Sequence, residues 1–219
     1  LEEEKLDVLT IISESTPKLK IDSIQINSIL DIFENPNIKL SNYCHYIFFF
    51  LLLLLGLSIY KDYGFNIDEA FQRRSGFYWL NFLAEFFRLD SLAYIANEKF
   101  NNAIDFTMPW KETDKTYGLI FDVPAALLEI LFNLKDPLKF YEMRHLLTFL
   151  YFFIGSIYFY KLLVNRFGNR YISLLGCLLL IITPRVFGEF FHNNKDIIFL
   201  SIFIITSYYY FKTIDNNNY

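Results

Sequence analysis

The chain has 219 residues, of which 54% are apolar and 20% aromatic, and its formal net charge is −4. This composition argues against a soluble domain and indicates an integral membrane protein. The negative charge comes from residues 1–41, which hold eight acids and four bases, so the remainder is neutral. A chain with this charge balance lacks the basic surface that nucleic-acid binding requires.

Residues 1–41 are expected to form a polar N-terminal extension without catalytic residues. The turn at Asn35-Pro36-Asn37 closes this segment. The chain begins with Leu and ends soon after an apolar run, so we expect it to be a piece of a longer protein.

Four uncharged runs reach or approach the length of a transmembrane helix. They hold 19, 15, 14 and 15 residues and cover 42–60, 146–160, 171–184 and 197–211. A membrane span needs about 17 to 25 residues, so Lys161, Arg170 and Lys212 are expected to lie inside helices, with their charges reaching the interface. The sequence therefore predicts an all-α polytopic membrane protein with about four transmembrane helices over residues 42–212, followed by a polar tail over 213–219.

About eighty residues separate the first and second apolar runs. They hold amphipathic stretches such as 77–87, where aromatic residues are mixed with Asn81 and Glu85. Such a pattern predicts an interfacial helix on the membrane or an amphipathic helix packed on a soluble core. The segment 117–134 is apolar but contains Asp122, Pro124 and Glu129. A lipid-facing helix disfavours two carboxylates, so we expect a helix beside the membrane or inside a bundle.

The topology decides whether two charged segments lie on the same side. If 117–134 does not span, the basic loop 161–170 faces the same side as the N-terminus, and its three bases mark that side as cytoplasmic. Asp68-Glu69 and the segment 185–196 would then both lie outside. The first outer loop would carry the interfacial helices.

The first charged motif is Asp68-Glu69, shortly after the first apolar run. One interpretation is helix capping, with Asn66 or Asp68 as the N-cap and the carboxylates stabilised by the helix dipole. The other is catalytic, because a carboxylate at the membrane face can accept a proton from an attacking hydroxyl.

The second charged motif interrupts two apolar stretches between Pro184 and Asp196. Arg185, His192 and Lys195 are donors suited to phosphate oxygens, while Glu189 or Asp196 could orient an acceptor or a cation. The alternatives are a hydrophilic turn between spans and a helix start capped by Asn193 or Asn194.

These motifs together resemble the N-terminal part of a membrane glycosyltransferase of the GT-C superfamily. The elements are Asp68-Glu69, the run 117–124 with Asp122 and Pro124, Arg144-His145, and the run 184–196. They are most similar to the dolichyl-phosphate-mannose protein mannosyltransferases, over roughly residues 42–212. The chain departs from that pattern at Asn194, where related sequences have Pro, and near Glu189, where they often have His. Family members usually have more spans.

The resemblance implies that a sugar is transferred from a polyprenyl-phosphate donor to a protein, lipid or glycan acceptor outside the cytoplasm. Asp68, with Glu69 beside it, is the expected catalytic residue, and Arg185, Glu189, His192, Lys195 and Asp196 are the expected substrate-binding residues. The resemblance assigns no definite cofactor, and a divalent cation is compatible with the site. The expected location is a bacterial inner membrane or an endoplasmic reticulum membrane. The alternative is a non-catalytic transporter part or assembly subunit whose outer charges bind a partner.

Overall fold

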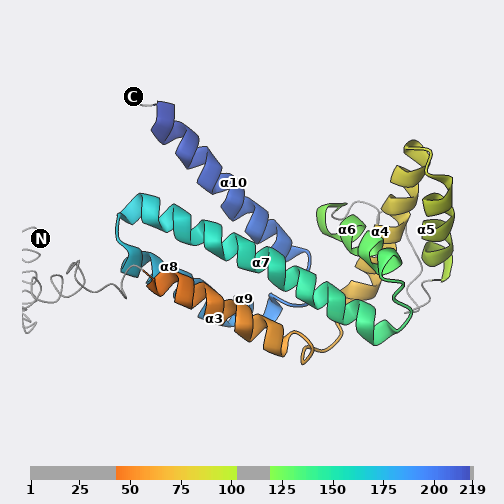
Figure 1. Ribbon diagram of the computed structural model, residues 1–219, viewed down its shortest axis with the longest axis horizontal. Helices are drawn as coiled ribbons and strands as arrows, with labels where there is room; N and C mark the ends of the chain where they lie inside the picture. Colours follow the sequence, from red (N-terminus) through yellow and green to blue (C-terminus); the bar gives the residue numbers. More distant parts are fainter. Residues whose placement is uncertain (1–42, 103–118, 218–219) are drawn as a thin grey trace, which may run out of the picture. The chain divides into compact units, whose positions relative to one another are not determined.

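The computed structural model describes residues 43–102 and 119–217, and in these ranges every regular element is a helix (Figure 1). The helices are α3 (Cys44–Ile59), α4 (Ile67–Phe86), α5 (Asp90–Asn102), α6 (Leu119–Leu131), α7 (Pro137–Phe167), α8 (Arg170–Ile182), α9 (Pro184–Glu189) and α10 (Asp196–Asn217). The predicted all-α class is therefore confirmed. The predicted extension 1–41 lies outside the described residues.

The helix ends follow from local side-chain chemistry. Asn66 caps α4 and forms a reciprocal capping box with Glu69, as one of the two sequence interpretations predicted. Asp136 caps α7 ahead of Pro137, and Gly168 ends that helix in the left-handed conformation. Capping thus sets both ends of the longest helix and the start of the helix that carries the acidic pair.

Helix α7 is the central element of the apolar part of the chain. It packs against α10 and against α3 and α8 (Figure 1). Its buried Phe149 and Phe152 meet α3, α8 and the pair Phe190 and Phe191 in one aromatic core. A β-carbon on Gly155 would lie 2.9 Å from Ser201 of α10, so a glycine permits the close approach of these two helices.

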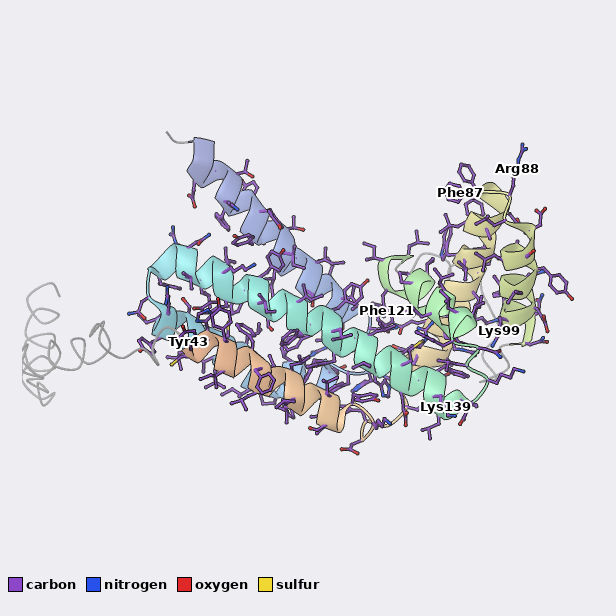
Figure 2. All side chains as sticks on the ribbon, viewed as in Figure 1. Tyr43, Phe87, Arg88, Lys99, Phe121 and Lys139 are labelled. Carbon is purple, nitrogen blue, oxygen red and sulfur yellow. The ribbon has the colours of Figure 1, made fainter. Side chains whose placement is uncertain are left out.

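Helices α4, α5 and α6 pack against one another through a smaller core that contains Phe77, Leu80, Ala96 and Ala126. Phe77 of α4 is therefore buried against other helices, while Phe82, Phe86 and Phe87 are exposed. One face of this amphipathic helix is packed, and its place at the membrane interface stays a prediction. The chain reverses between α4 and α5 at Arg88, which has a left-handed φ of 57° (Figure 2).

Helix α6 links this layer to the apolar helices. It has 13 residues, about 20 Å, so it is too short to cross a hydrocarbon core of about 30 Å. Its Phe121 and Ala125 pack with Ile198 of α10 (Figure 2). Over residues 119–131 the segment is thus a short helix packed on α10, which agrees with the expected helix inside a bundle.

Among residues 43–102 and 119–217, two helices are long and apolar enough to cross a membrane, α7 and the Asp196–Asp215 part of α10. The other two predicted spans are shorter apolar helices, because α3 has 16 residues and α8 has 13. Helix α8 stops at Ile182 because Thr183 is extended and Pro184 starts the short α9. Helix α10 continues to Asn217, into the segment predicted as a polar tail.

The apolar helices present large hydrophobic side chains outward. Exposed examples are Phe50 and Leu54 on α3, Leu175 on α8, and Phe199 and Phe203 on α10. Many large apolar side chains exposed on neighbouring turns of a helix are typical of a surface that contacts a membrane or another protein. Together with the two long apolar helices, it supports membrane association.

Candidate functional site

The acidic pair opens helix α4, and its two carboxylates have different environments. Asp68 is exposed, and its carboxylate makes no hydrogen bond or ion pair among the described residues. Glu69 is buried, with 2% of its surface exposed. Its Oε2 accepts a hydrogen bond of 2.8 Å from the backbone N–H of Asn66. Of the pair, Asp68 is available to a substrate, while Glu69 is held by the fold.

His145 of α7 contacts the buried member of this pair. Its Nε2 lies 2.9 Å from Oε1 of Glu69, an ion-pair distance, although the orientation is not that of a hydrogen bond. The imidazole is 3% exposed, and its Nδ1 has no hydrogen-bond partner within residues 43–102 and 119–217. The contact between Glu69 and His145 therefore joins the start of α4 to α7.

Asp122 of α6 is the centre of a second buried polar contact. Its Oδ1 accepts hydrogen bonds from Arg144 Nη1 at 3.1 Å and from Asn194 Nδ2 at 3.3 Å. Burial raises the pKa of Asp122 to about 6, and the neighbouring Arg144 opposes that rise. These contacts join α6, α7 and the segment before α10, and Arg144 is adjacent to His145. Two sets of buried contacts thus reach α7 at consecutive residues, Glu69 with His145 and Asp122 with Arg144 and Asn194, and we call these five side chains the buried polar cluster.

Several polar atoms in this cluster lack partners. Within the described ranges, Nε and Nη2 of Arg144 and Oδ1 of Asn194 are buried without hydrogen bonds. Buried polar groups are normally paired, and an unpaired one marks a place where a water, ion or substrate group can bind. The cluster therefore has unused hydrogen-bonding capacity.

The predicted substrate-binding residues lie in and around α9 and at the start of α10. Arg185, Lys195 and Asp196 are exposed, whereas Glu189 and His192 are partly buried. His192 Nε2 lies 3.5 Å from Glu189 Oε2. Arg185 makes no hydrogen bond or ion pair among the described residues, which leaves its guanidinium accessible.

The helix-start interpretation of Asn193 is confirmed by a reciprocal contact. The backbone N–H of Asp196 donates to Asn193 Oδ1 at 2.9 Å, and Asn193 Nδ2 donates to Asp196 Oδ2 at 3.0 Å. Asn194, the other predicted cap, points instead to Asp122. Asp196 therefore has a structural partner, while Asn194 belongs to the buried polar cluster.

Tyr63 brings the two charged segments together. Its hydroxyl donates to the backbone carbonyl of Phe187 at 3.1 Å, and its ring lies 4.5 Å from that of Phe191 and 5.9 Å from that of His192. The loop after α3 therefore contacts the segment around α9, although 124 residues separate Tyr63 from Phe187. This contact agrees with the expectation that the two loops lie on the same side.

A cavity of about 380 Å³ opens beside His145. Aromatic walls come from Tyr63, Phe65 and Tyr141, and polar groups come from Lys61, Glu142 and His145. Lys61 Nζ lies 3.9 Å from Glu142 Oε2. A mainly apolar cleft with a few converging polar groups is typical of small-molecule sites.

A separate buried ion pair holds α4 against α6. Arg73 donates from Nε and Nη2 to the two carboxylate oxygens of Glu129 at 2.8 and 2.7 Å, and Lys99 Nζ of α5 lies 3.4 Å from Oε1 (Figure 2). The Arg73 guanidinium also lies 3.8 Å from the centre of the Phe140 ring. This pair is a structural support for the helix that carries Asp68.

Four residues of the buried polar cluster were not predicted as site residues. Asp122, Arg144 and His145 were elements of the family resemblance without an assigned role, and Asn194 was a candidate helix cap. Within the described parts of the chain, no group of three or more His, Cys, Asp or Glu side chains is placed to hold a metal ion. Comparisons with protein-family models, curated proteins and solved structures find no match to the chain.

Proposed function

We propose that this chain is part of a membrane glycosyltransferase that moves a sugar from a polyprenyl-phosphate carrier to an acceptor outside the cytoplasm. The observation that supports it best is the buried polar cluster of Glu69, Asp122, Arg144, His145 and Asn194. Glu69 and Asn194 of this cluster belong to the two charged motifs, and Tyr63 contacts the segment around α9. Asp68, which precedes Glu69, is exposed. Polar groups near the end of a membrane helix are expensive to bury, so such a cluster favours a functional site.

The proposed reaction is a single inverting displacement. The oxygen of an acceptor hydroxyl attacks the anomeric carbon, and Asp68 takes the hydroxyl proton. The bond between that carbon and the phosphate oxygen breaks, and its electron pair leaves with the carrier phosphate. Arg185, His192 and Lys195 stabilise the negative charge of this phosphate. A divalent cation beside the phosphate is compatible with the mechanism and is not required by it.

In this proposal Glu69 positions Asp68 instead of reacting. Its two oxygens are directed to the backbone of Asn66 and to His145, so it fixes the first turn of α4 against α7. A base must be held within hydrogen-bond reach of the acceptor, and a fixed first turn meets that need. The cavity beside His145 provides room for a sugar-sized group near this turn.

The acceptor is a protein, a lipid or a glycan, and the membrane is a bacterial inner membrane or that of the endoplasmic reticulum. Both proposals rest on the resemblance of the motifs, and the two long apolar helices agree with a membrane location.

Donor titration tests the proposal. Short-chain polyprenyl-phosphate mannose is titrated against the purified full-length protein and the variants Arg185→Gln and Lys195→Gln. One charge-assisted hydrogen bond contributes roughly 1.5 to 3 kcal/mol, and both side chains are exposed, so we expect the low end, about ten-fold weaker binding in each variant.

Lys139→Gln is the matched control, because Lys139 is exposed near the start of α7 and outside the second charged loop (Figure 2). It should leave donor affinity unchanged. Wild-type protein without donor affinity, or equal affinity in the two loop variants and the wild type, would contradict the phosphate site and favour a non-catalytic membrane module.

A further inference from the structure

A second polar region lies on α7 and α10 away from the candidate site. Lys161 is the first charged residue after the uncharged run 146–160, and Lys212 is the first after the uncharged run 197–211. Each lysine therefore marks the point where an apolar helix meets water. Helices α7 and α10 pack together, so the two lysines can lie on one surface of the protein.

Tyrosine contacts place the two lysines at the same height along the packed pair α7 and α10. The Tyr158 hydroxyl of α7 lies 3.1 Å from the Tyr209 hydroxyl of α10. Lys161 Nζ lies 4.7 Å from the centre of the Tyr158 ring, and Lys212 Nζ lies 5.9 Å from that of Tyr208. Lys161 and Lys212 each lie three residues after a tyrosine of this hydroxyl pair, on the same face of the helix. The two charges thus flank one pair of hydroxyls.

The surrounding charge is positive. Residues 158–170 and 208–215 contain four bases, Lys161, Arg166, Arg170 and Lys212, and one acid, Asp215. Both lysines and Tyr209 are exposed. Tyrosine rings favour the headgroup level of a bilayer, and lysines there attract anionic headgroups.

We propose that Lys161 and Lys212, with the hydroxyls of Tyr158 and Tyr209 between them, bind the phosphate of an anionic phospholipid. The ammonium groups supply the charge and the hydroxyls supply hydrogen bonds to phosphate oxygens. The acyl chains would lie along the exposed apolar side chains of α10, such as Phe203. The proposal is independent of any transferase activity.

Native mass spectrometry of the purified full-length protein tests this site, with phosphatidylglycerol and phosphatidylcholine as probes. We expect the wild type to retain phosphatidylglycerol preferentially. Each of Lys161→Gln and Lys212→Gln should weaken that binding about five-fold. The charge-preserving variant with Lys161→Arg and Lys212→Arg should retain it, which separates loss of charge from loss of fold.

The control is Lys135→Gln combined with Lys139→Gln, which removes two exposed charges outside the proposed site. Equal losses in the control and the site variants would show general attraction to anionic lipid and overturn the proposal. A wild type without preference for phosphatidylglycerol would also overturn it. If soluble glycerol phosphate competes as strongly as the lipid, the site takes free phosphate and the lipid assignment is wrong.

Discussion

Replacing Glu129 by Gln should strongly destabilise the layer of α4, α5 and α6. Glu129 is fully buried and receives two hydrogen bonds from Arg73, whose side chain is 6% exposed. Two charge-assisted hydrogen bonds at roughly 1.5 to 3 kcal/mol each set an upper range of about 3 to 6 kcal/mol. The Lys99 side chain is 29% exposed, so water replaces much of its interaction. We therefore expect a loss of about 3 to 5 kcal/mol, typical of a buried charge left without its partner.

The assay is denaturant unfolding in detergent micelles, which gives the free energy of unfolding. Tryptophan fluorescence reports the transition, because Trp79 lies in α4. Glu98→Gln is the matched control because Glu98 is exposed on α5, and it should change stability by less than about 0.5 kcal/mol. Arg73→Met together with Glu129→Leu should recover much of the loss, since no charge then remains buried alone. A change below about 1 kcal/mol for Glu129→Gln would refute the assignment of this pair as the support of α4.

Three further predictions concern the titration of Asp122, the contact between Gly76 of α4 and α6, and the membrane topology. The pKa of Asp122 is raised from 3.8 to about 6, so between these pH values the folded protein binds more protons than the unfolded chain. The free energy of unfolding should therefore fall as the pH rises from about 4 to about 6. Asp122→Asn should remove this pH dependence in the same denaturation assay. Gly76→Ala should destabilise by about 1 to 3 kcal/mol, because its β-carbon would overlap the backbone carbonyl of Asp122, whereas Gly64→Ala, in open space, should be nearly neutral. In a background without Cys44 and Cys177, an impermeant thiol reagent added outside should label a cysteine at position 62 but not one at position 165, and the opposite pattern would reverse the topology.

Much of the helical order was predictable from local signals. Asn66 was one of two proposed caps, and the capping box with Glu69 confirms it. The carboxylates of Asp122 and Glu129 argued against a span at 117–134, and the short, packed α6 agrees with that argument. The lengths of the apolar helices were harder to predict, because α8 ends where Thr183 and Pro184 redirect the chain.

The pairing of buried charges was not predictable. Asp68 and Glu69 are adjacent, and successive helical residues point in different directions, so only the position of α7 decides that Glu69 is buried. The contact from Asp122 to Asn194 spans 72 residues and has no local signature. The sequence therefore indicated which segments carry charge, and tertiary packing selected the charges that meet.

Transfer of labelled sugar by the Asp68→Asn variant tests the central proposal most directly. Membranes containing the full-length protein receive radiolabelled polyprenyl-phosphate mannose, and label is counted in protein, lipid and glycan. Asp62→Asn, which alters another exposed acid of the same loop, is the control. Asp68→Asn keeps the size of the side chain and removes the base, so transfer should be lost at normal protein abundance, while Asp62→Asn should transfer as the wild type does. Transfer by Asp68→Asn within a few-fold of wild type, or no transfer by the wild type, would contradict the proposal.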